Sequence, residues 1–341
     1  MMNKVKEVTV ERNEGDPVAT MPERLTVAAS PHEKTRTHVP HLMRDVLIAL
    51  LPACLFGILW FGPRAALLCG ISVLTCILAE LLYEKLLRRP VTVRDGSAAV
   101  TGLLLAMNLP YTMPIPMLLL ADVFAIILVK QIFGGLGKNI VNPALAARVF
   151  LFMSFPGAMA NFSARPDFGA SYTDAVTSAT TLTSLKEGLG GSFTITDLFF
   201  GTTPGCIGEV SALLLLVGGV YLLCRRVITW HIPVSYLGTV ALLTFLIPRT
   251  GDRMESMLLE LCAGGLLLGA FFMATDYVTS PVTRGGRLIY GVLCGAITVF
   301  IRYCGVYAEG VSFAILIGNL LVYYLDRFTR PTPFGKRRGK R

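Results

Sequence analysis

The sequence has little charge for its length, and it lacks the short motifs of soluble nucleotide-binding enzymes. Only 16% of its 341 residues are charged, against about 25% in soluble domains. It contains no P-loop, no Rossmann glycine fingerprint and no arrangement typical of a Ser-His-Asp hydrolase. We therefore do not expect NAD to bind to this chain.

Metal-ligand patterns are missing as well. The four His residues form no HExxH motif, and the eight Cys residues form no CxxC pair. An iron–sulfur cluster needs several thiolates brought together, and the spacing gives no sign of this. Seven of the Cys residues lie in or beside apolar runs, which favours structural burial, and Cys206 falls in a long polar loop. No metal site is predicted.

Apolar residues are abundant, at 53% of the chain, and they are gathered into ten runs. Runs of this kind indicate an integral membrane protein. Residues 1–42 carry six basic and six acidic side chains without an apolar core, so they are predicted to be a soluble tail and not a signal peptide. The ten predicted segments are 43–62, 65–87, 97–110, 115–133, 143–156, 209–224, 231–247, 257–274, 287–303 and 311–325.

The distribution of basic residues predicts the orientation in the membrane. With the N-terminus inside, 23 Lys and Arg fall in inner segments and five in outer ones, which places both termini in the cytoplasm. The basic C-terminal tail then faces anionic lipid or a partner, and nucleic acid is not expected. The predicted regions are the tail 1–42, a first five-helix unit 43–156, an extracytoplasmic loop 157–208, a second five-helix unit 209–325 and the tail 326–341.

Five segments before the loop and five after it predict two inverted repeats, because an odd number of spans reverses orientation. The third segments share "GLLLAMN" at 102–108 and "GLLLGAF" at 265–271, although chance similarity between Leu-rich helices is the alternative. Segment 97–110 would span about 21 Å as a helix, too short for a hydrocarbon core of about 30 Å. Short or broken helices at this depth predict a ligand site near the midplane.

The outer loop contains a crowded hydroxyl stretch with a distinctive order of residues. Such a stretch can serve for solvation, helix capping or glycosylation. The run Asp174-Ala175-Val176-Thr177-Ser178-Ala179-Thr180, however, resembles the pattern to which a flavin transferase attaches FMN by a phosphoester to the last hydroxyl. Asp174, Thr177, Ser178 and Ala179 would form the motif around the acceptor, Thr180.

Further blocks resemble the RnfD/NqrB family. They are "GGLGKNIVNPALAARVF" at 134–150, "ATDYVTSPVTRGG" at 274–286 and "EGVSFAILIGNLL" at 309–321, in the family's order within about residues 30 to 330. The short N-terminal tail favours the Rnf-type member, RnfD. Two departures concern the cytoplasmic loops: "DYV" replaces the usual Asp-Pro-Val, and a proline is missing before Asp326.

The resemblance implies an all-α membrane protein of about ten helices in two inverted repeats, in a bacterial inner membrane. It implies covalent FMN on Thr180 on the outer face and a second, non-covalent flavin nearer the cytoplasm, riboflavin. The implied function is electron transfer within an ion-translocating ferredoxin:NAD+ oxidoreductase that moves Na+ or H+. The implied partners are the other Rnf subunits, of types A, B, C, E and G, and a flavin transferase for maturation.

Two inner loops, one from each predicted repeat, are candidates for the second flavin site. The alternative for the glycine-rich part is a helix-ending turn with an interfacial lysine. The candidate residues are Lys138, Asn139, Asn142, Arg148, Thr275 and Asp276.

Carboxylates inside apolar runs are costly and therefore suggest function. Glu80 lies deep in the second segment and Asp122 near the middle of the fourth, while Glu260 lies near the start of the eighth. Glu80 and Asp122 are candidates for a Na+ or H+ path. The alternative is pairing with the backbone or with a nearby cation.

Three other functions stay open at this point. One is the B-type component of a sodium-translocating NADH:quinone reductase, which differs in the product of the complex. Another is a solute transporter or channel, which an inverted repeat fits equally well. A passive scaffold protein without a cofactor would predict an altered acceptor, whereas Thr180 is present.

Overall fold

A computed structural model describes residues 38–162, 181–186, 194–201, 204–249, 252–305 and 307–331, with side chains in 181–186 described for Leu182, Thr183 and Ser184. The chain divides into two units, Met1–His38 and Val39–Arg341, and the helices described here belong to the second. Within the described residues every regular element is a helix. The predicted all-α class is confirmed.

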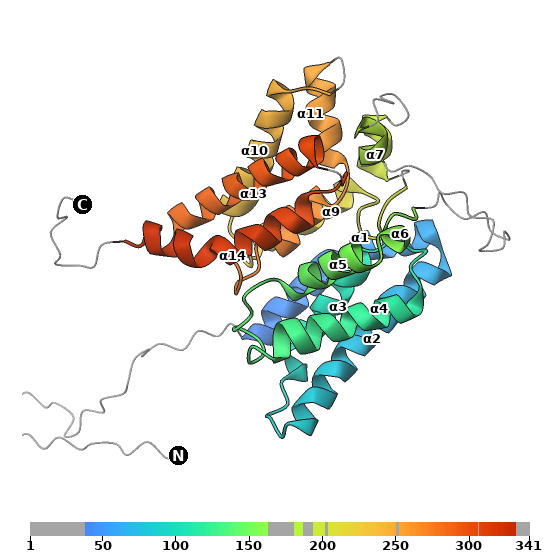
Figure 1. The fold of residues 1–341 in the computed structure, drawn as a ribbon, viewed down its shortest axis with the longest axis vertical. Coiled ribbons are helices and arrows are strands. Elements are labelled where there is room, and N and C mark those ends of the chain that lie inside the picture. Colours follow the sequence, from blue (N-terminus) through green and yellow to red (C-terminus); the bar gives the residue numbers. More distant parts are fainter. Residues whose placement is uncertain are drawn as a thin grey trace, which may run out of the picture. The chain divides into compact units, whose positions relative to one another are not determined.

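The first half of the chain forms a group of helices joined by short turns (Figure 1). Pro63 opens α2 at a position where a helix needs no N–H, and the Asn142 side chain caps α5 by accepting from the Ala144 N–H at 3.1 Å. The elements are α1 (Val39–Phe61), α2 (Pro63–Leu86), η1 (Val93–Asp95), α3 (Ser97–Met107), α4 (Ile115–Val123), the π-helix η2 (Phe124–Gln131), α5 (Pro143–Ser154) and α6 (Pro156–Met159).

The second half forms a similar series after two short connecting helices. Asp252 caps α11 by accepting from the Met254 N–H, and Thr283 caps α13 by accepting from the Gly286 N–H. The elements are α7 (Thr181–Lys186), α8 (Ile195–Phe200), α9 (Ala212–Cys224), α10 (His231–Leu246), α11 (Arg253–Cys262), α12 (Leu266–Leu268), the π-helix η4 (Gly269–Met273), α13 (Arg284–Cys304) and α14 (Val311–Thr329).

Four of these helices, α1, α2, α13 and α14, are long and apolar enough to cross a membrane. A fifth span is possible where α11 and the helix 266–273 meet at a bend of 63°. Shorter apolar helices are α3, α5, α9 and α10. The predicted membrane class is therefore confirmed, whereas ten complete spans stay a prediction. As expected from segment 97–110, α3 is short, at 11 residues.

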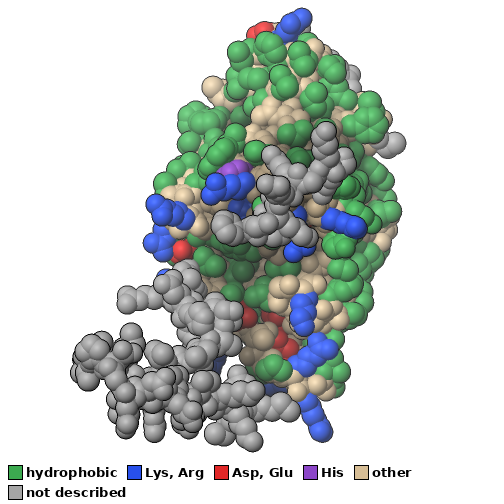
Figure 2. Space-filling view, turned by 90° about the vertical axis from the view of Figure 1, so that its left-hand side faces the viewer, with side chains coloured by type: hydrophobic (Ala, Val, Ile, Leu, Met, Phe, Trp, Pro, Cys, Tyr) green, Lys and Arg blue, Asp and Glu red, His purple; other side chains and the backbone are tan. Residues whose placement is uncertain are grey.

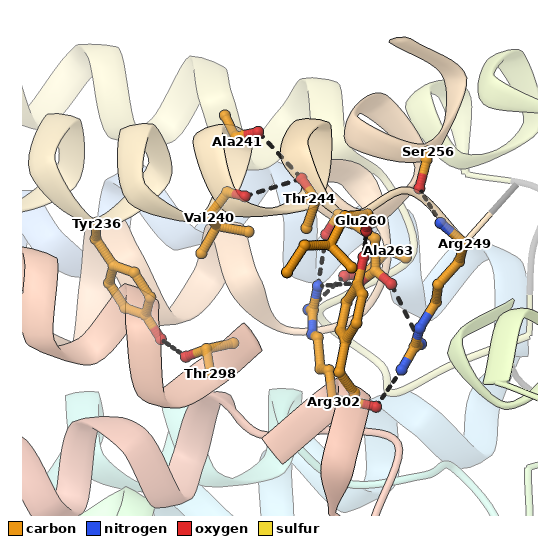
Figure 3. Close-up of polar contacts among 12 residues, drawn as sticks. Tyr236, Val240, Ala241, Thr244, Arg249, Ser256, Glu260, Ala263, Thr298 and Arg302 are labelled. Atoms are coloured by element: carbon orange, nitrogen blue, oxygen red, sulfur yellow. Dashed lines mark hydrogen bonds and ion pairs between the residues drawn. The ribbon is translucent and has the colours of Figure 1, made fainter. Parts of the chain in front are cut away.

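The bend in the second half is held by a buried cluster of charges (Figure 3). Gly264 has φ +66°, a left-handed conformation that favours glycine. The Arg302 guanidinium donates to the Glu260 carboxylate at 2.9 Å and to the Ala263 carbonyl at 3.1 Å. Arg249 also pairs with Glu260, at 3.3 Å. Arg302 thus satisfies carbonyls where α11 ends, those of Glu260 and Ala263, while Arg249 donates to the Arg302 carbonyl of α13.

Each half packs around one central helix. In the first half, α2 contacts α3, α4 and η2, and in the second half α10 contacts α11 and α13. Gly291 and Gly295 of α13 bring that helix against the backbone of α10, because a Cβ at Gly295 would lie 2.9 Å from the Tyr236 carbonyl oxygen. The halves meet where α1 packs on α9 and α5 packs on α14.

Apolar side chains cover much of the face seen in the space-filling view (Figure 2). On α2 the exposed side chains include Leu67, Leu74, Leu78 and Leu82. The opposite face of the same helix buries Ser72, Cys76, Glu80 and Glu84, spaced four residues apart. An apolar outside and a polar inside are typical of a helix that faces lipid on one side and a functional interior on the other.

Candidate functional site

A pocket lies where the two halves of the chain meet. It encloses about 770 Å³ of non-protein space, counting the solvent at its mouth. Its wall is formed by α1, α3, η2, the loop before α5, the end of α9 and η4. Both π-helices contribute side chains, Lys130 from η2 and Phe271 and Phe272 from η4. π-Helical turns are frequent at functional sites.

Four of the six residues predicted for the second flavin line this pocket. Asn139 and Asn142 come from the loop after η2, and Thr275 and Asp276 follow η4. The Asn142 amide donates to the Met273 carbonyl at 3.3 Å, which ties the two loops together. The structure thus brings residues 136 positions apart, Asn139 and Thr275, into one wall, as predicted for these two loops.

Two polar groups of the pocket are poised to bind a ligand. Asn139 is buried, and its Oδ1 atom has no hydrogen-bond partner within the described residues. A buried acceptor without a partner is unfavourable, so a ligand N–H or O–H would stabilise it. Burial raises the pKa of Asp276 above its usual value, although hydrogen bonds from Thr279 and the backbone N–H groups of Val278 and Tyr277 oppose the shift.

One member of a buried ion pair, Lys130, forms part of the pocket wall. Lys130 is 1% exposed, and its Nζ atom lies 2.6 Å from Glu80 Oε1 and donates to Ser97 Oγ at 2.7 Å. Gln131 also donates to Glu80 Oε1, at 2.8 Å. The second carboxylate oxygen, Oε2, has no hydrogen-bond partner within the described residues. Glu80 is therefore paired on one oxygen, and its cation borders the pocket.

Asp122, on α4, contacts the same buried stripe of α2 but has no cationic partner in the described part of the chain. Its Oδ1 atom accepts from Ser72 at 2.6 Å and from the Cys76 thiol at 3.5 Å, and its Oδ2 atom is unpaired. Cys76 lies one helical turn before Glu80 on α2. The two carboxylates proposed for an ion path thus face one polar stripe inside the first half.

Arg148 and Lys138 lie away from the pocket wall. Arg148, six residues after Asn142 on α5, is about 9 Å farther along the helix. Its guanidinium pairs with Glu309 and with Glu209, the latter at 3.4 Å. Lys138 is exposed. Arg148 therefore joins the loops before α9 and α14 and does not extend the pocket.

The residues of the predicted FMN attachment, Asp174, Thr177, Ser178, Ala179 and Thr180, lie outside the described residues. Description resumes at α7, where Leu182 is 2% exposed. Leu182 packs with Leu198 of α8 and with Leu259 and Ala263 at the end of α11. The helix after the predicted acceptor is thus held against the bend of the second half.

Comparison with known proteins gives a family for the whole described region. A family model described as "NQR2, RnfD, RnfE family" matches residues 26–335. The D component of the Na(+)-translocating ferredoxin:NAD(+) oxidoreductase complex of Acetobacterium woodii is 46% identical over 314 residues, covering 91% of this chain and 95% of that protein. The chain belongs to the NQR2, RnfD, RnfE family. The resemblance noted in the sequence is confirmed.

Other relatives in the family carry similar names. The D component of the proton-translocating ferredoxin:NAD(+) oxidoreductase complex of Clostridium ljungdahlii is 41% identical over 324 residues, covering 92% of this chain and 97% of that protein. The D component of the ion-translocating oxidoreductase complex of Escherichia coli O81 is 34% identical over 348 residues, covering 92% and 99%. The names specify Na+ in one relative and protons in another, so both transported ions occur within the family.

Sequence reasoning did not select Lys130, Phe271 or Phe272 for the pocket, nor Glu209 and Glu309 as partners of Arg148. Lys130 ends an apolar run, where a lysine resembles an interfacial cation. Lys130 lies within the predicted segment 115–133, however, and a lysine inside an apolar segment is a signal for pairing with a buried carboxylate.

Proposed function

We propose that this chain is the D-type membrane component of an ion-translocating ferredoxin:NAD+ oxidoreductase and that it relays electrons through two flavins. The names of relatives that align over more than nine-tenths of the chain support this role. Its partners would be the Rnf proteins of types A, B, C, E and G. The fold would be two inverted five-helix repeats in the bacterial inner membrane, with both termini in the cytoplasm.

The packing of the helices supports an inverted repeat. If α1 corresponds to α9 and α5 to α14, the contacts between the halves join equivalent helices, as a two-fold axis requires. The contact of α2 with α4 and η2 corresponds to that of α10 with α13, and the contact of α5 with η2 to that of α13 with α14. The short α3 corresponds to the segment 266–273, which follows the bend after α11.

The pocket between the halves is the observation that carries the proposal of a non-covalent flavin, riboflavin in our prediction. Phe271 and Phe272 offer apolar faces to a planar ring, and the free Asn139 Oδ1 can accept from a ring N–H. Lys130 places a positive charge in the wall. A bound flavin would supply the capacity to accept electrons singly or in pairs.

The covalent FMN would be attached to Thr180 on the extracytoplasmic side. The order of residues from Asp174 to Thr180 supports this assignment. The buried contacts of Leu182 would hold the chain that follows the attachment point. Electron flow through two flavins changes charge within or beside a low-dielectric region, which favours compensating movement of Na+ or H+.

The proposal is tested by measuring flavin in the protein purified from cells that contain a flavin transferase. After denaturing electrophoresis, we expect flavin fluorescence in the wild type and in Thr181→Ala, a matched control one residue away, and its loss in Thr180→Ala. Acid extraction of the native protein should release a second flavin in all three. A wild-type protein without either flavin, beside a working transferase control, would favour a solute transporter. NADH as the product of the complex separates the Rnf assignment from a quinone reductase.

A further inference from the structure

Lys130 faces two environments at once. Its ammonium binds Glu80 Oε1 and Ser97 Oγ, and its side chain lines the pocket. Glu80 has no other cationic partner in the described part of the chain, and its Oε2 atom is unpaired although the side chain is 1% exposed. The buried Lys130 side chain therefore pairs with the Glu80 carboxylate and also borders the pocket.

Among the residues that line the pocket, one side chain is acidic and one is basic. Asp276 is the acidic residue among those that line the pocket, and it accepts a hydrogen bond from Thr279. Lys130 is the basic residue of that wall. A ligand that gains negative charge therefore meets this ammonium as its counter-charge within the wall, because the low dielectric strengthens attraction over short distances.

We propose that Lys130 couples the charge of the ligand in the pocket to Glu80, a role that rests on the proposed flavin pocket. When the ligand gains an electron, the Lys130 ammonium is drawn toward it and its hold on Glu80 weakens. Glu80 then takes up a monovalent cation, Na+ or a proton, at the carboxylate that Lys130 releases. The electron comes from the reduced ferredoxin side of the complex. Uptake of Na+ changes no covalent bond of the chain, whereas uptake of a proton from water forms one O–H bond on the Glu80 carboxylate.

The need for a replacement cation follows from burial. A carboxylate without a counter-charge in the protein interior is strongly unfavourable, so Glu80 must remain paired or be neutralised. The unpaired Oε2 atom provides a free ligand position, and Gln131 stays in place to hold Oε1. Asp122, with its own unpaired Oδ2, continues the stripe of polar groups on α2 through Cys76 and Ser72.

The test is the midpoint potential of the non-covalent flavin, measured by spectroscopic redox titration of the purified complex. A Thr180→Ala background removes the signal of the covalent flavin in this chain. Lys130→Gln should shift the potential to more negative values, because a positive charge beside the reduced ligand is lost. Glu80→Gln should shift it to more positive values, because Lys130 no longer has a competing partner. We expect at least a tenfold change in the ratio of oxidised to reduced flavin in each case.

Lys138→Gln is the matched control, since this exposed lysine lies in the same inner loop but outside the pocket wall. It should leave the potential unchanged. Shifts of the same sign in Lys130→Gln and Glu80→Gln, or no shift in either with flavin bound, would overturn the coupling. If no flavin is released from the wild type, the proposed flavin pocket fails instead, and the two failures are distinguishable.

The cation that Glu80 takes up is identified in the same titrations. A potential that rises with Na+ at fixed pH in the wild type, but not in Glu80→Gln, assigns sodium. A pH dependence that is reduced in Glu80→Gln assigns a proton. If Glu80→Gln alters neither dependence, Glu80 does not take up the cation and the proposal is wrong.

Discussion

Two buried carboxylates, Glu80 in the first half and Glu260 in the second, are each 1% exposed but have different surroundings. Glu260 binds two arginines, one on each carboxylate oxygen, at the bend of a broken helix. Glu80 binds one lysine on one oxygen, and that lysine borders a pocket. Both carboxylate oxygens of Glu260 thus have partners, whereas only one oxygen of Glu80 does within the described residues.

The difference indicates which cluster supports the fold and which is suited to change. Arginine stays charged and binds carboxylates and carbonyls with a planar set of donors, so the Glu260 cluster is rigid. Lysine is a flexible point charge that can exchange one partner for another. We therefore interpret the Glu260 cluster as structural and the pair of Glu80 and Lys130 as functional.

The largest expected effect on stability is in the structural cluster. Arg302→Met removes the buried donor to Glu260 and to the Ala263 carbonyl, and it should reduce the free energy of unfolding by about 3–5 kcal/mol. Thermal unfolding in detergent measures the effect. Arg253→Met, an exposed arginine on the same helix as Glu260, is the control. A melting temperature equal to that of the control would contradict a structural role.

Lys130→Met should destabilise the protein by about 3 kcal/mol, the lower end of the range for a broken buried pair, since Gln131 still binds Glu80. The double variant Lys130→Met/Glu80→Met should recover most of this loss, because no buried charge is left unpaired. A double-mutant cycle of unfolding free energies measures the coupling. If the loss of unfolding free energy in the double variant equals the sum of the losses in Lys130→Met and Glu80→Met, the two residues do not act as a pair.

A smaller effect is expected in the pocket itself. Asn139→Ala removes the free acceptor and should weaken binding of the non-covalent flavin by about 1 kcal/mol, a factor of about five. The measurement is the Kd for flavin added back to protein from which it has been extracted. The adjacent exposed residue offers a control, Lys138→Ala, with unchanged affinity. Equal affinity in Asn139→Ala would remove this residue from the site.

Asp122→Asn should have the smallest effect on stability, below about 1 kcal/mol, because Asp122 has no cationic partner to lose within the described residues and asparagine can still bind Ser72. Its effect on cation transport should be larger than its effect on unfolding. Transport assays in sealed vesicles compare it with Glu80→Gln. If both neutral variants pump normally with unchanged sodium dependence, neither carboxylate belongs to an ion path.

The sequence predicted where the helices lie along the chain more successfully than which side chains of different helices meet. The apolar runs located most helix cores, and the short α3 followed from the length of its run. Two loops predicted to form one site do line one pocket, with Asn139 and Asn142 from the first and Thr275 and Asp276 from the second, and the Asn142 amide ties them together by donating to the Met273 carbonyl. Arg148 was grouped with them by closeness in sequence, yet one and a half turns of α5 separate it from Asn142.

Ion pairs between residues far apart in the sequence could not be predicted from individual apolar segments. Lys130 and Glu80 are 50 residues apart, and their contact depends on which faces of α2 and η2 pack together. Likewise, Arg302 and Glu260 meet because α11 ends beside α13. Periodicity identifies the buried face of a helix, but the opposing helix is set by tertiary packing.

The most direct test of the central claim is the number of cations transported per electron by the double variant Glu80→Gln/Lys130→Gln, measured with the complex in sealed vesicles. The variant preserves the hydrogen-bonding side chains and removes both charges. We predict a folded complex that transfers electrons but moves far fewer cations per electron than the wild type. A wild-type ratio in this variant would contradict the assignment of Glu80 and Lys130 to ion coupling.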